Sequence, residues 1–77
     1  MATRAYVLIT TEVGKTKDVV ERARKITGVT MADVVAGSYD VVVVLECPDA
    51  NAIGRVVLNE LHGMPGLKNT LTLIAVS

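Results

Sequence analysis

The residues of this sequence best suited to chemistry form the short polar segment Gly37-Ser38-Tyr39-Asp40. A carboxylate, a phenol and a hydroxyl that follow one another can hydrogen-bond a small ligand. Tyr39 is also one of only two aromatic residues in an otherwise aliphatic chain. The same segment suits a tight turn, because glycine reaches positive φ and aspartate bonds to nearby backbone amides. A binding role and a turn role both remain open for it.

Other motifs that could do chemistry point to structural roles. Gly14-Lys15-Thr16 resembles the end of a phosphate-binding loop, but the glycine required five residues earlier is Ile9. His62, the only histidine, is expected at the end of a helix, where the dipole favours positive charge. Cys47, the only cysteine, has no basic neighbour in sequence to lower its pKa and is interpreted as a structural thiol. No catalytic residue, metal site or cofactor is predicted.

Composition narrows the class of protein. The 77 residues predict a single domain, 1–77, with a core of Val, Leu, Ile and Ala. Eight basic and eight acidic residues cancel without forming a run of like charge, which argues against direct binding of DNA. No segment has the pattern of a signal peptide or the apolar length of a membrane span. We therefore expect a cytoplasmic protein with no membrane association.

Patterns along the chain predict the element order βαββαβ. The first helix should carry its apolar stripe at Val19, Val20, Ala23 and Ile26, and Asp49 should cap the second helix. The expected elements are a strand at 4–11, a helix at about 16–26, a strand pair at 28–36 and 41–46, a helix reaching about Leu61, and a strand at 67–76. This order predicts an α+β, ferredoxin-like fold, with an antiparallel four-stranded sheet and two helices on one face.

The two strands expected at the centre of this sheet are apolar at nearly every position. They are Tyr6 to Ile9 and Val41 to Leu45. A strand with one solvated face alternates between apolar and polar residues, whereas a continuous apolar run is buried on both faces. Two helices can cover only one face of the sheet. We therefore expect a second copy to cover the other face, giving a dimeric α/β barrel by sheet-to-sheet packing.

Four segments together resemble a known family. They are Gly28-Val29, the run from Gly37 to Val44, Met64-Pro65-Gly66-Leu67 and Thr70-Leu71-Thr72. In order and spacing they are similar to the effector-binding domain of Lrp/AsnC-type transcription regulators, also called the RAM domain, over nearly the whole chain. The resemblance implies a regulatory protein rather than an enzyme. It also implies that face-to-face dimers assemble into rings, commonly octamers.

The resemblance further implies a small effector, often an amino acid, bound in a cleft between neighbouring dimers. Carried over by position, one side of the cleft is lined by Gly37, Ser38, Tyr39 and Asp40. Thr70 and Thr72 then face these residues and offer hydroxyls to a carboxylate. Backbone amides at the glycine turn can also receive the carboxylate, while Asp40 can accept from the ammonium group.

One departure concerns DNA binding. Regulators of this family carry a helix-turn-helix segment before the domain, whereas here the first strand begins within a few residues of Met1. The chain resembles the stand-alone form, so full-length Lrp/AsnC-type regulators are expected partners. Two alternatives remain: an ACT-like amino-acid-binding module, which shares the topology, and a small dimeric α+β barrel enzyme. Such an enzyme would need polar groups between the sheets, and the central strands supply almost none.

Overall fold

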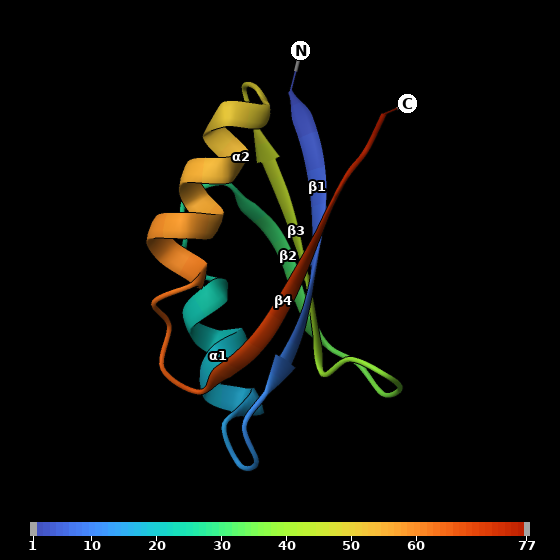
Figure 1. The fold of residues 1–77 in the computed structure, drawn as a ribbon, viewed down its shortest axis with the longest axis vertical. Coiled ribbons are helices and arrows are strands. Elements are labelled where there is room, and N and C mark those ends of the chain that lie inside the picture. Colours follow the sequence, from blue (N-terminus) through green and yellow to red (C-terminus); the bar gives the residue numbers. More distant parts are fainter. Residues whose placement is uncertain (1, 77) are drawn as a thin grey trace.

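Four antiparallel strands form one sheet, and the helices cover only one of its faces (Figure 1). The structure is a computed structural model that describes residues 2–76. Its elements are β1 (Thr3–Thr11), α1 (Thr16–Ala23), β2 (Val29–Val34), β3 (Val41–Cys47), α2 (Ala50–Val56), the π-helix η1 (Val57–Leu61) and β4 (Leu67–Ile74). The strand order β2-β3-β1-β4 puts β1 and β3 in the centre. The predicted α+β, ferredoxin-like fold is confirmed.

Alternation along the central strands separates the two faces of the sheet. Val7 lies opposite Val43 in the β1–β3 ladder, and both side chains are fully buried beneath the helices. The next pair, Leu8 and Val42, points to the other face and is only half buried. Opposite residues of an antiparallel pair share a face, so the neighbouring strands also alternate between a helix-covered side and an uncovered side. One face is a packed core and the other is open.

The core is aliphatic, as the composition predicts. β1 and β3 contribute alternate residues, α1 contributes Val19, Val20 and Ala23 of the predicted stripe, and the second helical segment contributes Ile53, Val57 and Leu61. The thiol of Cys47 is buried at the end of β3, in keeping with its structural interpretation. None of the helices described within residues 2–76 is long and apolar enough to cross a membrane.

The first helix ends at Ala23 rather than at Ile26, so the predicted boundary is wrong by three residues. The backbone N–H groups of Lys25 and Ile26 donate three residues back, to the carbonyls of Arg22 and Ala23, and tighten the last turn. Arg24 Nε donates to the Ala32 carbonyl at 3.0 Å and fastens this turn to β2. The helix therefore ends before the glycine that sequence patterns favoured, and Ile26, the last residue of the predicted stripe, is only partly buried against the core.

The second helix begins as predicted and then changes character. Asp49 accepts a hydrogen bond from the Ala52 amide at 2.8 Å, which confirms the predicted N-cap. Beyond Val56 the chain widens into a π-helical turn, where the N–H of His62 donates to the Val57 carbonyl at 2.9 Å. Such turns are rare, and no sequence pattern indicated this one. The last strand, β4, ends at Ile74, two residues earlier than expected.

The connection from η1 to β4 depends on Gly66. Its φ of +87° lies in the left-handed region, and an added Cβ would come within 2.7 Å of the Lys15 Cβ. Glycine is therefore required twice here, for its backbone conformation and for the lack of a side chain. The Glu12 N–H donates to the Gly66 carbonyl at 2.8 Å, which holds this connection against the end of β1.

We predict that Asp49→Ala lowers the free energy of unfolding by about 1 kcal/mol, because the Ala52 amide loses its capping acceptor. Urea denaturation followed by circular dichroism measures the loss. Asn51→Ala is the matched control, since Asn51 is an exposed residue in the same helical turn. Asp49→Asn should retain most of the cap. Equal losses for Asp49→Ala and Asn51→Ala would show that the cap contributes nothing.

Candidate ligand-binding site

A six-residue loop, Val35–Asp40, joins β2 to β3 and projects beyond the end of the sheet (Figure 1). The N–H of Val35 donates to the Asp40 carbonyl at 2.9 Å and closes the loop. Asp40 in turn donates its N–H to the Ile9 carbonyl on β1, also at 2.9 Å. Gly37 has a φ of +143°, so glycine is needed for this backbone conformation, as the turn role predicts.

The Asp40 side chain ties this loop to two other elements. Its Oδ2 accepts from the Thr11 N–H at 2.8 Å and from the Thr11 hydroxyl at 3.4 Å. The Thr11 hydroxyl also lies 2.7 Å from the hydroxyl of Thr16, the first residue of α1. A continuous hydrogen-bonded chain therefore joins the loop to the end of β1 and the start of α1. The turn role of Asp40 is present in the protomer.

The loop also retains unused hydrogen-bonding capacity. Within residues 2–76, neither Asp40 Oδ1 nor the amides of Gly37, Ser38 and Tyr39 have a hydrogen-bond partner in the protomer. Gly37 and Ser38 are exposed, and Tyr39 and Asp40 are half buried. One carboxylate oxygen and three amide donors can therefore face a ligand while the second oxygen holds the loop. This arrangement is suited to a molecule that carries both an anionic and a cationic group.

Thr70 and Thr72 lie elsewhere in the protomer. They pair with Ile9 and Val7 of β1, so their side chains are on the helix-covered face of β4. The sheet order places β1 between β4 and the strand that follows the loop. The structure thus brings together the four loop residues but does not bring the two threonines to them. Within the described protomer the six predicted residues form two separate groups.

Sequence reasoning missed the neighbour of Thr70. His62 Nε2 lies 3.3 Å from the Thr70 hydroxyl, and both residues line an open polar cavity of about 430 Å³ with Leu67, Lys68 and Asn69. His62 is exposed at the end of η1, as expected, but its contact with β4 depends on the connection through Gly66. No group of three or more metal-ligating side chains is assembled within residues 2–76.

The uncovered side of the sheet carries a large apolar surface, here called the open face. It consists of Tyr6 and Leu8 on β1, Met31 on β2, Val42 and Val44 on β3, and Leu71 and Leu73 on β4. Met31 is 54% exposed, Leu71 45% and Leu73 47%. Monomeric proteins seldom leave such contiguous apolar surface in water. The protomer therefore exposes an area suited to contact with another molecule.

Polar groups lie at the two ends of the open face. At one end, Arg4 Nε is 3.9 Å from Glu46 Oε2. Hydrogen bonding to Tyr6, supported by the charge of Glu46, raises the pKa of the Arg4 guanidinium above its ordinary value. At the other end, Thr10 lies opposite Asn69, and its hydroxyl is buried without a partner within residues 2–76. Between these ends the two central strands carry no charged side chain on this face, and Asp33 of the edge strand β2 lies beside Val42.

The fold and these surfaces agree with comparisons to known proteins. Residues 4–77 match the family model described as the Lrp/AsnC ligand binding domain. The chain belongs to the Lrp/AsnC family. An uncharacterised HTH-type transcriptional regulator of Pyrococcus furiosus is 32% identical over 78 residues, which cover 97% of this chain and 52% of that regulator. A Pyrococcus abyssi counterpart is 30% identical with the same coverage. The chain thus spans about half the length of these curated relatives.

Solved structures of Lrp/AsnC-like proteins share the fold closely. The crystal structure of FFRP-DM1 is 30% identical with a TM-score of 0.91, and the match covers 96% of this chain and 99% of that one. TTHA0845 from Thermus thermophilus is 25% identical with a TM-score of 0.93, covering 97% and 94%. Escherichia coli AsnC, at 18% identity and a TM-score of 0.90, supports the fold alone. The predicted family resemblance is confirmed, and the sequence relatives are named as HTH-type transcriptional regulators.

We predict that Asp40→Ala destabilises the protein by about 1–2 kcal/mol, because the Thr11 amide loses its acceptor in a half-buried position. Asp40→Asn should lose less, since the amide oxygen can still accept from Thr11. Thermal and urea unfolding at one fixed protein concentration measure both losses. A matched control is Glu21→Ala, which removes an exposed carboxylate from α1. If Asp40→Ala were no more destabilising than Glu21→Ala, the hydrogen-bonded chain would contribute nothing to stability.

Proposed function

We propose that this chain is a small-molecule effector-binding, oligomer-forming regulatory domain linked to transcription or amino-acid metabolism. Its effector is a small amino acid or a similar zwitterion. The observation that carries the proposal is the loop at 37–40, where free amide donors lie beside a carboxylate with one unused oxygen. A Neisseria meningitidis regulator of the same fold, 17% identical with a TM-score of 0.86, was crystallised as a complex with L-Met. That complex supports the ligand class by fold alone.

The binding unit is an assembly of protomers. The open face packs against its copy, so that the sheets of two protomers enclose the apolar side chains in a dimeric α/β barrel. The loop of one dimer then meets Thr70 and Thr72 of a neighbouring dimer, and the effector lies between them. Dimers joined in this way form a ring, for which we propose an octamer. The separation of the loop from the threonines within one protomer supports a site shared between protomers.

The domain acts on transcription through partners rather than through direct DNA contact. Its eight basic and eight acidic residues cancel, so it has no overall excess of positive charge to replace the counterions of the phosphate backbone. Mixed assembly with full-length Lrp/AsnC-type regulators would bring the effector site to DNA. An ACT-like module remains an alternative regulatory reading. The enzyme alternative is disfavoured by the open face, whose central strands offer mostly aliphatic side chains, with Tyr6 as the one polar group between Arg4 and Thr10.

We predict that Val44→Glu dissociates or unfolds the dimer. Each Val removed from an apolar contact forfeits roughly 1.5–3 kcal/mol, and the new carboxylates would face each other's sheet without partners. Val44 lies between Tyr6 and Met31 at the centre of the open face. Val13→Glu is the matched control, because Val13 lies fully exposed in the turn before α1. Sedimentation equilibrium at micromolar concentration reports the mass of each variant. A dimer that persists in folded Val44→Glu, or a folded wild-type monomer, contradicts sheet-to-sheet assembly.

The effector site is tested by affinity and stability measured side by side. Asp40→Asn keeps the acceptor for Thr11 but removes the charge that would pair with an ammonium group. A charge-assisted hydrogen bond is worth about 1.5–3 kcal/mol, so the dissociation constant for an amino acid should rise roughly ten- to a hundredfold. Calorimetric titration with a panel of amino acids first identifies a ligand of the wild-type protein and then measures the change.

The control is Glu21→Gln, which removes one negative charge at an exposed position of α1. It should leave the dissociation constant within about twofold of the wild-type value, since an exposed charge away from the loop is screened by salt. An unchanged affinity in Asp40→Asn together with a lowered melting temperature would show that Asp40 has a purely structural role. Failure of every amino acid to bind the wild-type assembly would reject the proposed ligand class.

A further inference from the structure

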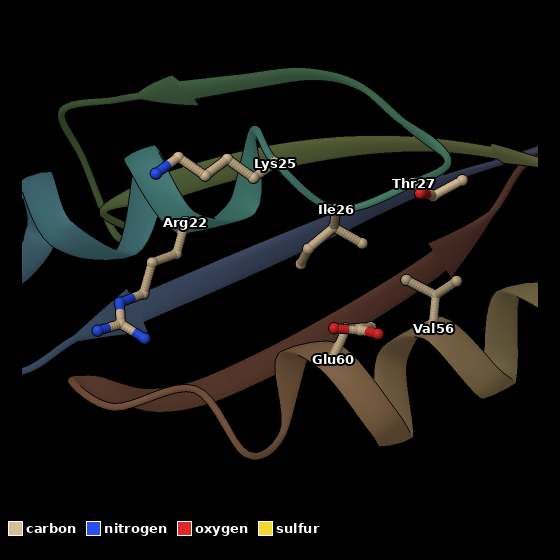
Figure 2. Close-up of a pocket in the computed structure, with 6 residues that line it drawn as sticks. All are labelled: Arg22, Lys25, Ile26, Thr27, Val56 and Glu60. Atoms are coloured by element: carbon tan, nitrogen blue, oxygen red, sulfur yellow. The ribbon is translucent and has the colours of Figure 1, made fainter.

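A second cavity lies on the opposite side of the protomer from the open face, between the two helical segments (Figure 2). It has a volume of about 480 Å³, within the range of small-molecule sites. The end of α1 and the turn after it supply Arg22, Lys25, Ile26 and Thr27, and the facing helix supplies Val56 and Glu60. We call this cavity the helix groove. Sheet-to-sheet packing would leave it accessible, because it belongs to the helix layer.

The helix groove has an apolar middle. Ile26 and Val56 project toward each other from the two sides in Figure 2. Both side chains are half buried and rest on the hydrophobic core. Their positions are therefore fixed by packing, while their outer surfaces remain open to the groove. A hydrocarbon segment of a ligand could lie between them and release water from both.

Charged groups of opposite sign stand on different sides of this apolar middle. Arg22 and Lys25 come from α1 and its last turn, and Glu60 comes from η1. Figure 2 shows the Arg22 guanidinium and the Glu60 carboxylate apart from each other across the groove. Within residues 2–76 the one ion pair joins Arg4 to Glu46, so these three charges are not neutralised by one another. The groove thus offers cationic and anionic partners at separate points.

The π-helical turn contributes to the same wall. Val57 and Leu61 of η1 are buried, whereas Asn59 and Glu60 between them are exposed. A smaller cavity of about 240 Å³ continues the groove past Asn59 and shares Arg22, Ile26 and Glu60 with it. π-turns are uncommon and concentrate at functional sites. Glu60, which lines the helix groove, therefore belongs to a segment that departs from regular α-helix.

We propose that the helix groove binds a small linear zwitterion, with a carboxylate at one end, an ammonium group at the other and a methylene chain between. The carboxylate pairs with Arg22, the ammonium pairs with Glu60, and the chain lies on Ile26 and Val56, while Lys25 points away from the groove in Figure 2 and adds only a nearby positive charge. An α-amino acid fits this pattern poorly, since its two charges share one carbon atom. The site is thus distinct in place and ligand from the loop site, and it does not depend on the proposed function.

The probe is ε-aminocaproate, titrated into the assembled protein with isotope-labelled methyl groups. Saturable shifts are expected at the methyls of Ile26 and Val56, with none at the methyl groups around the loop, such as Val35. Caproate and n-hexylamine, which each lack one charge, should bind about fivefold more weakly, the effect of losing roughly 1 kcal/mol from a solvent-exposed ion pair. Shifts near the loop alone would instead report binding at the other site.

Two variants with matched controls complete the test. Glu60→Gln and Arg22→Gln should each weaken ε-aminocaproate binding about fivefold. Glu21→Gln and Lys17→Gln make the same charge changes at exposed positions of α1 outside the groove and should leave it unchanged. All four side chains are exposed, and melting curves confirm that each variant is folded. The absence of saturable shifts at millimolar probe, equal binding of caproate, or equal weakening by the control variants would each overturn the proposal.

Discussion

The structure depends on one imbalance of surface: the helical layer can cover only one face of a four-stranded sheet whose central strands are apolar on both. The buried side chains of α1 and α2–η1 pack against the helix-side residues of β1 and β3 in one core. Residues of the opposite parity, including Leu8 and Val44, are left on the open face. Because the hydrophobic effect scales with exposed apolar area, this face favours contact with another molecule. The proposed assembly thus follows from the composition of the sheet itself.

The loop site shows how structural and ligand-binding chemistry can share one side chain. Asp40 uses one carboxylate oxygen to hold Thr11 and leaves the other unoccupied within the described protomer. Its position is fixed before any ligand arrives, which lowers the ordering cost of binding. The turn role and the binding role, which the sequence left open as alternatives, are therefore compatible in one geometry. In the proposed site, a substitution that removes this carboxylate would therefore affect both folding and ligand binding.

Much of the fold was predictable because local and long-range signals agree. The β-branched runs, the stripe on α1 and the Asp49 cap each specify an element, and together they specify the topology. Three features were not accessible from spacing alone. The early end of α1 accompanies the contact of Arg24 with β2, the π-turn has no sequence signature, and the approach of His62 to Thr70 depends on how η1 joins β4. The ligand site at the loop stays a prediction, and so does its relation to the threonines of another protomer.

Helix α1 occupies a position between the two proposed ligand sites. Its first residue, Thr16, ends the hydrogen-bonded chain that begins at Asp40, and its last turn supplies Arg22 to the helix groove. Eight helical residues span about 12 Å at 1.5 Å per residue, so a rigid shift at one end is transmitted to the other. Val19 and Val20 lie in the core beneath the same helix, which restricts it to small displacements along packed surfaces. Helix α1 therefore gives the loop and the groove a short physical connection that begins at the carboxylate of Asp40, beside the second connection that β2 makes through Arg24 and Ala32.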